Sequence, residues 1–253
     1  MADLFQHIFN LPASCIFHTV MPKNAFEKNN SLSAAEKRLI NIPFLPLKAE
    51  FRASLVQARS FIPPKQSEDM DYEDILFFSL KLKPEHLETQ SDKLIQLYQK
   101  YIPKPCVLFL YDDTRFIVNT ALKKYNEADP KKRVVTEQLT TPIISIVDSE
   151  NKNENFIKSL HFEQINKQNL KTVHESYARS IINFNIVAAT GKVGNAEDVS
   201  ENAERLRQIV HIEKELNALR NHIRKSKNLK EKIDLKLQLK QKKQKMKNIK
   251  NSL

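Results

Sequence analysis

The chain has 253 residues, of which 41% are hydrophobic and 28% are charged, so it should bury a core while part of its length stays strongly solvated. No apolar run approaches the roughly 18 residues of a transmembrane helix, and residues 1–10 lack the features of a signal peptide. These patterns exclude a membrane-spanning class and predict a cytoplasmic protein. The two cysteines, Cys15 and Cys106, lie far apart and are expected to be buried and reduced.

The net charge of +11 is concentrated near the C-terminus. Between Arg224 and Lys250 there are 12 Lys or Arg residues and only two acidic residues. The rest of the chain then holds 29 basic and 28 acidic residues and is almost neutral. Anionic partners are therefore expected to bind the C-terminal segment.

The N-terminal third predicts short elements separated by prolines. Residues 16–20 form an apolar stretch that indicates a strand. Residues 33–42 have a helical pattern, in which Ser33 and Glu36 are spaced as a capping box and Pro43 ends the helix. Residues 50–58 favour a second, weaker helix.

The middle of the chain alternates strands and helices. Residues 75–82 have strand composition, residues 85–101 show helical periodicity, and residues 106–111 form an apolar run typical of a buried strand. An Asp-Asp-Thr turn leads back into a hairpin partner at 115–120, and further strands are predicted at 134–139 and 142–147. Hairpins outnumber βαβ patterns, so we predict an α+β domain with a mostly antiparallel sheet and packed helices.

The C-terminal part is predicted to be helical. Residues 171–184 carry an apolar stripe, and both glycines, Gly191 and Gly194, follow it. We therefore predict an α+β domain over residues 1–185, a flexible linker over 186–198 and a basic coiled-coil arm over 199–253. The coiled-coil seam, read from alternating three- and four-residue steps, comprises Ile209, Ile212, Leu216, Leu219, Ile223, Ile233 and Leu237.

A second apolar register in the arm leaves two conformations open. Leu235, Leu239, Met246 and Ile249 follow a different helical face from Ile233 and Leu237. Either one long helix changes its seam, or the arm folds back as a helical hairpin near Asn228.

Several short segments resemble a bacterial family of unknown function, number 4391. They comprise Leu11-Pro12-Ala13-Ser14, Met21-Pro22-Lys23 with Phe26, Ile102-Pro103 before the strand Cys106 to Tyr111, and the lysine-rich tail from Ile212 to Lys250. The chain departs from the family pattern at Phe51 to Leu55 and in having no tryptophan. The resemblance covers nearly the whole chain and implies a role beside helicases and DNA methyltransferases of restriction and antiphage systems. It brings no catalytic residues.

Catalytic and metal sites find little support in the residue pattern. The seven histidines are scattered without ligand spacing, so neither a metal nor a cofactor is expected. The enzymatic alternative is a divergent metal-dependent nuclease or effector. Such a site needs two carboxylates and a lysine close together. The residues available for it are Asp71, Glu73, Asp74, Lys81, Lys83, Asp112 and Asp113.

The basic arm is the strongest chemical feature of the sequence. Lysines at helical spacing can follow a phosphate backbone without reading its sequence, although a solvated coiled-coil face or a membrane-surface helix also accommodates them. The candidate nucleic-acid-binding residues are Arg224, Lys225, Lys227, Lys230, Lys232, Lys236, Lys240, Lys243, Lys247 and Lys250.

Together these patterns predict a non-catalytic accessory or adaptor subunit of a bacterial DNA-targeting defence complex. We expect it to bind a helicase, a DNA methyltransferase or a second copy of itself through the seam, and nucleic acid through the lysines.

Overall fold

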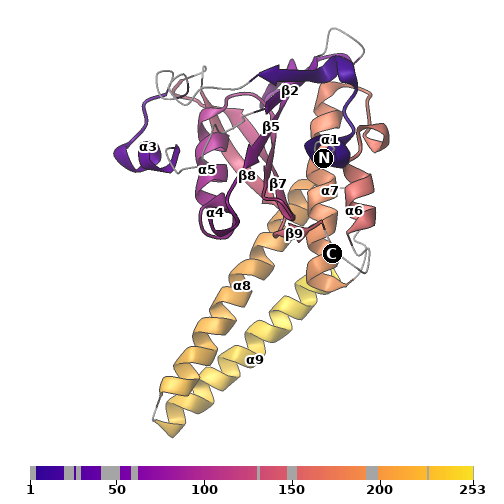
Figure 1. The fold of residues 1–253 in the computed structure, drawn as a ribbon. Helices are drawn as coiled ribbons and strands as arrows, with labels where there is room; N and C mark the ends of the chain where they lie inside the picture. Colours follow the sequence, from indigo (N-terminus) through magenta and orange to yellow (C-terminus); the bar gives the residue numbers. More distant parts are fainter. Residues whose placement is uncertain are drawn as a thin grey trace. The chain divides into compact units, whose positions relative to one another are not determined.

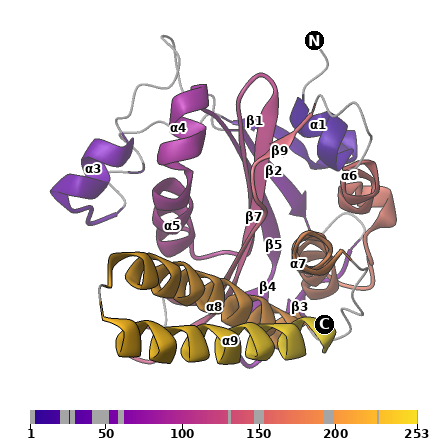
Figure 2. The same ribbon diagram turned by 90° about the horizontal axis from the view of Figure 1, so that it is seen from below.

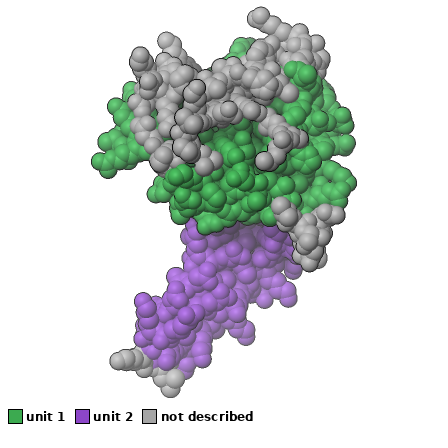
Figure 3. Space-filling model, viewed as in Figure 1, with its two compact units in different colours: residues 1–181 green, residues 182–253 purple. Residues whose placement is uncertain are grey.

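The computed structural model describes residues 4–19, 26, 30–40, 52–57, 62–129, 132–146, 153–191, 199–226 and 228–252. The chain divides into two compact units, residues 1–181 and residues 182–253, which are coloured separately in Figure 3 and are described here one at a time. Among the described residues, no helix is both long enough and apolar enough to cross a membrane.

Unit 1 is built on a mixed sheet, seven-stranded over the described residues, in the order β1-β2-β5-β6-β7-β8, with β9 also paired to β7 (Figure 1). A separate two-stranded sheet pairs β3 with β4. The strands are β1 (Ile16–Thr19), β2 (Arg52–Gln57), β3 (Lys65–Gln66), β4 (Asp71–Tyr72), β5 (Asp74–Lys81), β6 (Cys106–Tyr111), β7 (Arg115–Tyr125), β8 (Arg133–Thr140) and β9 (Ile144–Ser145).

One strand pair departs from the expected antiparallel pattern. β5 and β6 are parallel, with Leu76 opposite Cys106, while every other pairing in the sheet is antiparallel over the described residues. Two helices, α4 (Pro84–Thr89) and α5 (Ser91–Tyr101), make the crossover between these strands. The sequence predicted a single helix over 85–101 and favoured hairpins over βαβ units, whereas the structure contains one βαβ unit. Parallel strands need such a crossover, because a tight turn cannot join them.

Helices lie on both sides of this sheet, as Figure 2 shows. Helices α4 and α5 lie on one side, with α3 beside α5. Helices α1 and α6 and the first part of α7 lie on the other. Their bounds are α1 (Leu4–Phe9), α3 (Ala34–Ile40), α6 (Glu154–Leu160) and α7 (Leu170–Thr190), with single 3-10 turns at Ala13–Cys15 and Phe162–Gln164.

Both faces of the sheet are apolar. Neighbouring residues of a strand point to opposite sides, so an uninterrupted apolar strand such as β6 contributes to both faces. On β6, Leu108 and Leu110 belong to the cluster that includes α5. On the other face, the Phe109 ring packs edge-on against Phe9 at 5.6 Å between centroids, and Phe9 contacts Tyr177 of α7 in the same way at 5.9 Å. Both Cys15 and Cys106 are buried, as predicted.

Two predictions about secondary structure were wrong. Residues 52–57 form strand β2 instead of a helix, because they pair along their whole length with β5, a partner that is distant in sequence. The predicted linker 186–198 overlaps the end of α7, which continues through Thr190. Gly191 ends the helix at a φ of 72°, where its N–H donates to Val187 O at 2.8 Å. Residues 192–198 lie outside the described residues.

Unit 2 contains the end of α7 and two longer helices, α8 (Val199–Lys225) and α9 (Leu229–Asn251). Helices α8 and α9 pack together in opposite directions. The arm is therefore the helical hairpin that the sequence left open, and the long single helix is excluded. At the start of α9, the Asn228 side chain accepts hydrogen bonds from Lys230 N and Glu231 N and so caps the helix.

Candidate nucleic-acid interface

The hairpin of unit 2 fills its own apolar seam. Ile209, Ile212 and Leu216 of α8 are each about 2–3% exposed, and Leu235 of α9 is 7% exposed. Leu219 and Ile223 of the predicted seam are half-buried, as are Leu239, Met246 and Ile249 of the second register. The two registers thus occupy the facing sides of one intramolecular helix pair.

Polar contacts fix the register of α8 against α9. Lys242 Nζ lies 2.7 Å from Glu215 Oε2, which lowers the pKa of Glu215, mainly through that hydrogen bond. At the closed end of the hairpin, His222 Nε2 lies 3.3 Å from Glu231 Oε1. At the open end, Arg205 donates to Ser252 O at 2.8 Å. These contacts place the start of α8 beside the end of α9.

Four lysines form a stripe along the outer side of α9. Lys236, Lys240, Lys243 and Lys247 recur at i, i+4, i+7 and i+11, which keeps them on one side of a helix over a rise of about 16 Å. All four are exposed, and none has an ion pair or a hydrogen bond to another described residue. We call these four residues the lysine stripe; it is the largest set of uncompensated cations on α9.

The other candidate basic residues have different surroundings. Lys250 donates to Ala189 O at 2.8 Å and lies 3.8 Å from Glu213, so part of its charge is used within unit 2. Lys232 is half-buried, and Lys230, Arg224 and Lys225 are exposed near the turn. Lys227 lies outside the described residues. Only part of the predicted basic set therefore shares one face.

The remaining two seam candidates point away from the hairpin. Ile233 is 59% exposed and Leu237 is 57% exposed, and their spacing of four residues makes them neighbours on α9. They do not take part in the intramolecular seam, whose α9 side is formed by the second register. They lie close to the lysine stripe in the helical repeat.

The acidic residues considered for a nuclease are dispersed by the fold. Asp74, at the start of β5, pairs with Lys104, and Asp71 is hydrogen bonded to Tyr125. At the other end of β5, Lys81 Nζ lies 2.6 Å from Asp113. Among the described residues, no group of three or more His, Cys, Asp or Glu side chains is placed to hold a metal ion.

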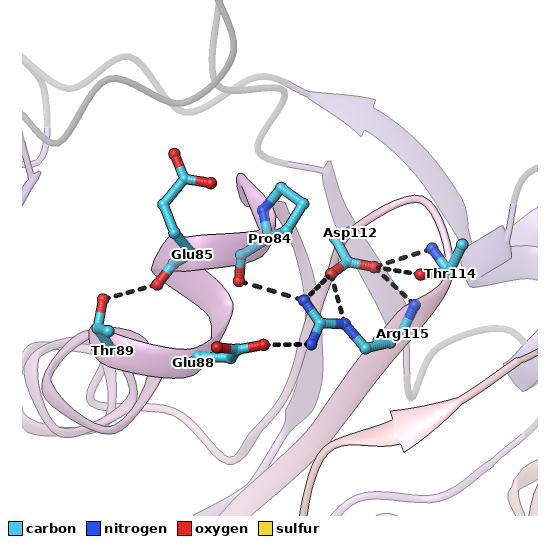
Figure 4. A network of polar contacts seen from close by, with 7 residues as sticks. All are labelled: Pro84, Glu85, Glu88, Thr89, Asp112, Thr114 and Arg115. Carbon is cyan, nitrogen blue, oxygen red and sulfur yellow. Dashed lines mark hydrogen bonds and ion pairs between the residues drawn. The ribbon is translucent and has the colours of Figure 1, made fainter.

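Asp112 instead closes the β6–β7 turn, as Figure 4 shows. Its Oδ1 accepts from the N–H groups of Thr114 and Arg115 at 2.8 and 2.7 Å, and its Oδ2 accepts from Arg115 Nε at 2.9 Å. The Arg115 guanidinium also contacts Glu88 and Pro84 O of α4. Burial would raise the pKa of Asp112, but these hydrogen bonds lower it below its usual range. The carboxylate therefore joins the hairpin to α4.

A buried polar network that sequence reasoning missed lies inside unit 1. Lys123 is 4% exposed and donates to Ile102 O at 2.6 Å, just after the end of α5; burial lowers its pKa. Thr120 donates its hydroxyl proton to Cys106 O at 2.9 Å, so its oxygen must accept from His174 Nε2 at 2.8 Å. Thr120 lies in a predicted strand and His174 in a predicted helix, but nothing in the sequence indicated that these polar side chains would be buried together.

Comparison with known protein families gives one match. The model of the family described as "Domain of unknown function (DUF4391)" matches residues 9–246. Neither the curated proteins nor the solved structures contain a significant match to the chain.

Proposed function

The chain belongs to the DUF4391 family of domains of unknown function, and we propose that it is a non-catalytic adaptor that contacts the nucleic-acid backbone through the lysine stripe of α9. Its setting in this proposal is a bacterial DNA-targeting defence complex of the antiphage or restriction type. A helicase or DNA methyltransferase would be the protein partner. The setting comes from the family resemblance, while the nucleic-acid contact rests on the residues of unit 2.

The lysine stripe is the observation that carries the proposal. Four exposed ammonium groups without described acidic partners attract phosphates and release the counterions condensed on them. Acidic residues of α8 are partly engaged elsewhere, since Glu215 pairs with Lys242 and Glu201 pairs with Arg205. A phosphate backbone would therefore meet the stripe without competition from these two carboxylates.

The proposal predicts a specific change in salt dependence. The slope of log K against log salt is negative, and each phosphate contact contributes about −0.9 to it for duplex DNA. Replacing Lys236, Lys240, Lys243 and Lys247 by glutamine should therefore reduce the steepness of this slope by about 3 to 4. Binding of the parent should be of the non-specific strength, with Kd values on the order of 10⁻⁶ to 10⁻⁴ M. Fluorescence anisotropy with a labelled duplex over a salt series measures both quantities.

A matched control separates the stripe from net charge. Four exposed lysines of unit 1, Lys65, Lys124, Lys158 and Lys167, are replaced by glutamine instead, which changes the net charge equally. This control should keep the slope of the parent. Equal slopes for both variants would show that the stripe makes no particular contact, and the proposal would fail.

A further inference from the structure

The second candidate binding surface lies in unit 1, between helices α3 and α5. A groove with a volume of about 690 Å³ runs between them. Ala35, Leu39 and Leu97 give it an apolar floor, and Leu39 and Leu97 belong to or pack on the buried cluster of this side of the sheet. The other lining residues are polar or charged: Glu36, Arg38, Gln90, Lys93, Gln96 and Lys100.

Specific contacts hold the two walls of the groove together. Ser33 and Glu36 form the predicted capping box of α3, with Ser33 N donating to Glu36 Oε2 at 2.8 Å and Glu36 N donating to Ser33 Oγ at 3.2 Å. Lys100 Nζ of α5 lies 2.8 Å from Glu36 Oε1, and Tyr101 OH lies 3.1 Å from Glu36 Oε2. The hydrogen bonds from Lys100, and then from Ser33, lower the pKa of Glu36 to about 2.

These contacts leave the groove with a positive rim. Because Glu36 and Lys100 neutralise each other, the charges left among the described lining residues are those of Arg38 on α3 and Lys93 on α5. Both side chains are exposed, and neither has an ion pair with another described residue. An apolar floor between two cations complements a ligand with an apolar ridge and anionic flanks.

We propose that the groove between α3 and α5 binds an acidic amphipathic helix of a protein partner. A groove between two helices accepts the ridge of a third helix, with apolar anchors at i, i+3 or i+4. The mostly apolar floor argues against a nucleic-acid backbone, which needs a row of cations rather than two. This inference takes from the proposed function only that the chain is an adaptor for a protein, since the groove and the lysine stripe belong to different units.

Two helical peptides test the proposal with the full chain. Both carry a fluorescein label and the same face of leucines; one has glutamates beside that face and the other has lysines. The acidic peptide should bind, as measured by fluorescence anisotropy, and the basic peptide should bind much more weakly. No binding of the acidic peptide, or equal binding of both, would overturn the proposal.

Variants at the groove locate the binding site. The double change Arg38→Glu with Lys93→Glu should weaken the acidic peptide about tenfold, since it reverses two rim charges. Ala35→Trp should abolish binding by filling the groove from α3. The control Lys37→Glu with Lys65→Glu makes the same charge change outside the groove and should leave binding unchanged. Identical affinities in all variants would contradict the assignment.

Two further measurements distinguish a protein partner in the groove from a second copy of the chain, and binding at the groove from binding at the lysine stripe. Sedimentation of the full chain tests whether a second copy fills the groove; a dimer that Ala35→Trp dissociates would overturn the proposed partner. Duplex DNA binding by the same groove variants should equal that of the parent. A loss of peptide binding without a loss of DNA binding therefore reports on the groove alone, and the lysine-stripe variants report on the proposed function.

Discussion

At the scale of single residues, the buried polar network of unit 1 has the clearest consequence. His174 is 1% exposed, and its Nε2–H donates to Thr120 while Nδ1 has no partner among the described residues. The neutral ring satisfies this arrangement, whereas a charged ring would bury an unpaired N–H. Burial, with a smaller contribution from Lys123, lowers the pKa of His174 to about 3.

This shift predicts acid sensitivity in a defined window. Below pH 6.5 the unfolded chain takes up a proton on His174 that the folded chain refuses until about pH 3, so folding stability falls as the pH falls between these values. At pH 5 the loss from this residue should be about 2 kcal/mol. His174→Gln keeps a donor toward Thr120 without titrating, so its stability should change less between pH 7 and pH 5.

Urea unfolding at the two pH values measures this effect. The readout is the difference between pH 7 and pH 5 within each protein, so that any cost of the substitution itself cancels. The parent should lose about 2 kcal/mol more than His174→Gln. Equal losses would mean that His174 accepts a proton in the folded protein.

At the scale of elements, the sequence predicted correctly those features that depend on residues close together in the chain. Residues 106–111 form β6 as predicted, because a short apolar run between Pro105 and an Asp-Asp turn has few alternatives. The Ser33–Glu36 capping box is also a local signal, and it is present. By contrast, strand β2 and the parallel pairing of β5 with β6 depend on partners distant in sequence, which composition does not specify.

The candidate sites also combine features that the sequence predicts with features that depend on tertiary packing. The helical spacing of the lysines could be predicted from the sequence, but the structure was needed to show that Lys236, Lys240, Lys243 and Lys247 are exposed while Lys250 contacts Glu213. Seven seam residues were predicted as one set, yet Leu216 is 3% exposed and Leu237 is 57% exposed. The groove between α3 and α5 could not be predicted, because it depends on the packing of two helices separated by several strands.

Because the predicted seam residues divide into buried and exposed ones, the same substitution should have a large effect on stability at one position and a small effect at another. Leu216→Asp places a carboxylate in the buried side of the hairpin and should cost about 3 to 5 kcal/mol. The result should be loss of helical signal by circular dichroism and rapid proteolysis within residues 199–252. Leu237→Asp, at an exposed position of α9, should change stability by less than about 0.5 kcal/mol. Similar effects of the two changes would contradict the intramolecular seam.

At the scale of the whole molecule, charge is distributed unevenly between the two units. Residues 1–181 contain 24 basic and 22 acidic residues, whereas residues 182–253 contain 17 basic and 8 acidic residues. Long-range attraction of a polyanion should therefore act mainly on unit 2. The groove of unit 1, with an apolar floor and two rim cations, is suited to a different kind of partner.

This distribution predicts the kind of nucleic acid that the chain prefers. No Phe, Tyr or Trp follows Phe184, so the hairpin lacks the large aromatic rings on which the bases of a single strand usually stack. Binding should depend on phosphate density, which is higher in a duplex, and should be independent of base sequence. Duplexes of equal length and different sequence should bind within about twofold, and a single strand of the same length should bind more weakly.

Competition in fluorescence anisotropy at one fixed salt concentration tests this preference. Unlabelled duplexes of unrelated sequence, and a single strand of the same length, each displace a labelled duplex from the full chain. A single strand that competes more strongly than the duplex would show that bases are bound, which the lysine stripe cannot do. A preference for one duplex sequence would require base contacts from other parts of the chain, because the flexible ammonium groups of the stripe meet the same phosphates in every duplex.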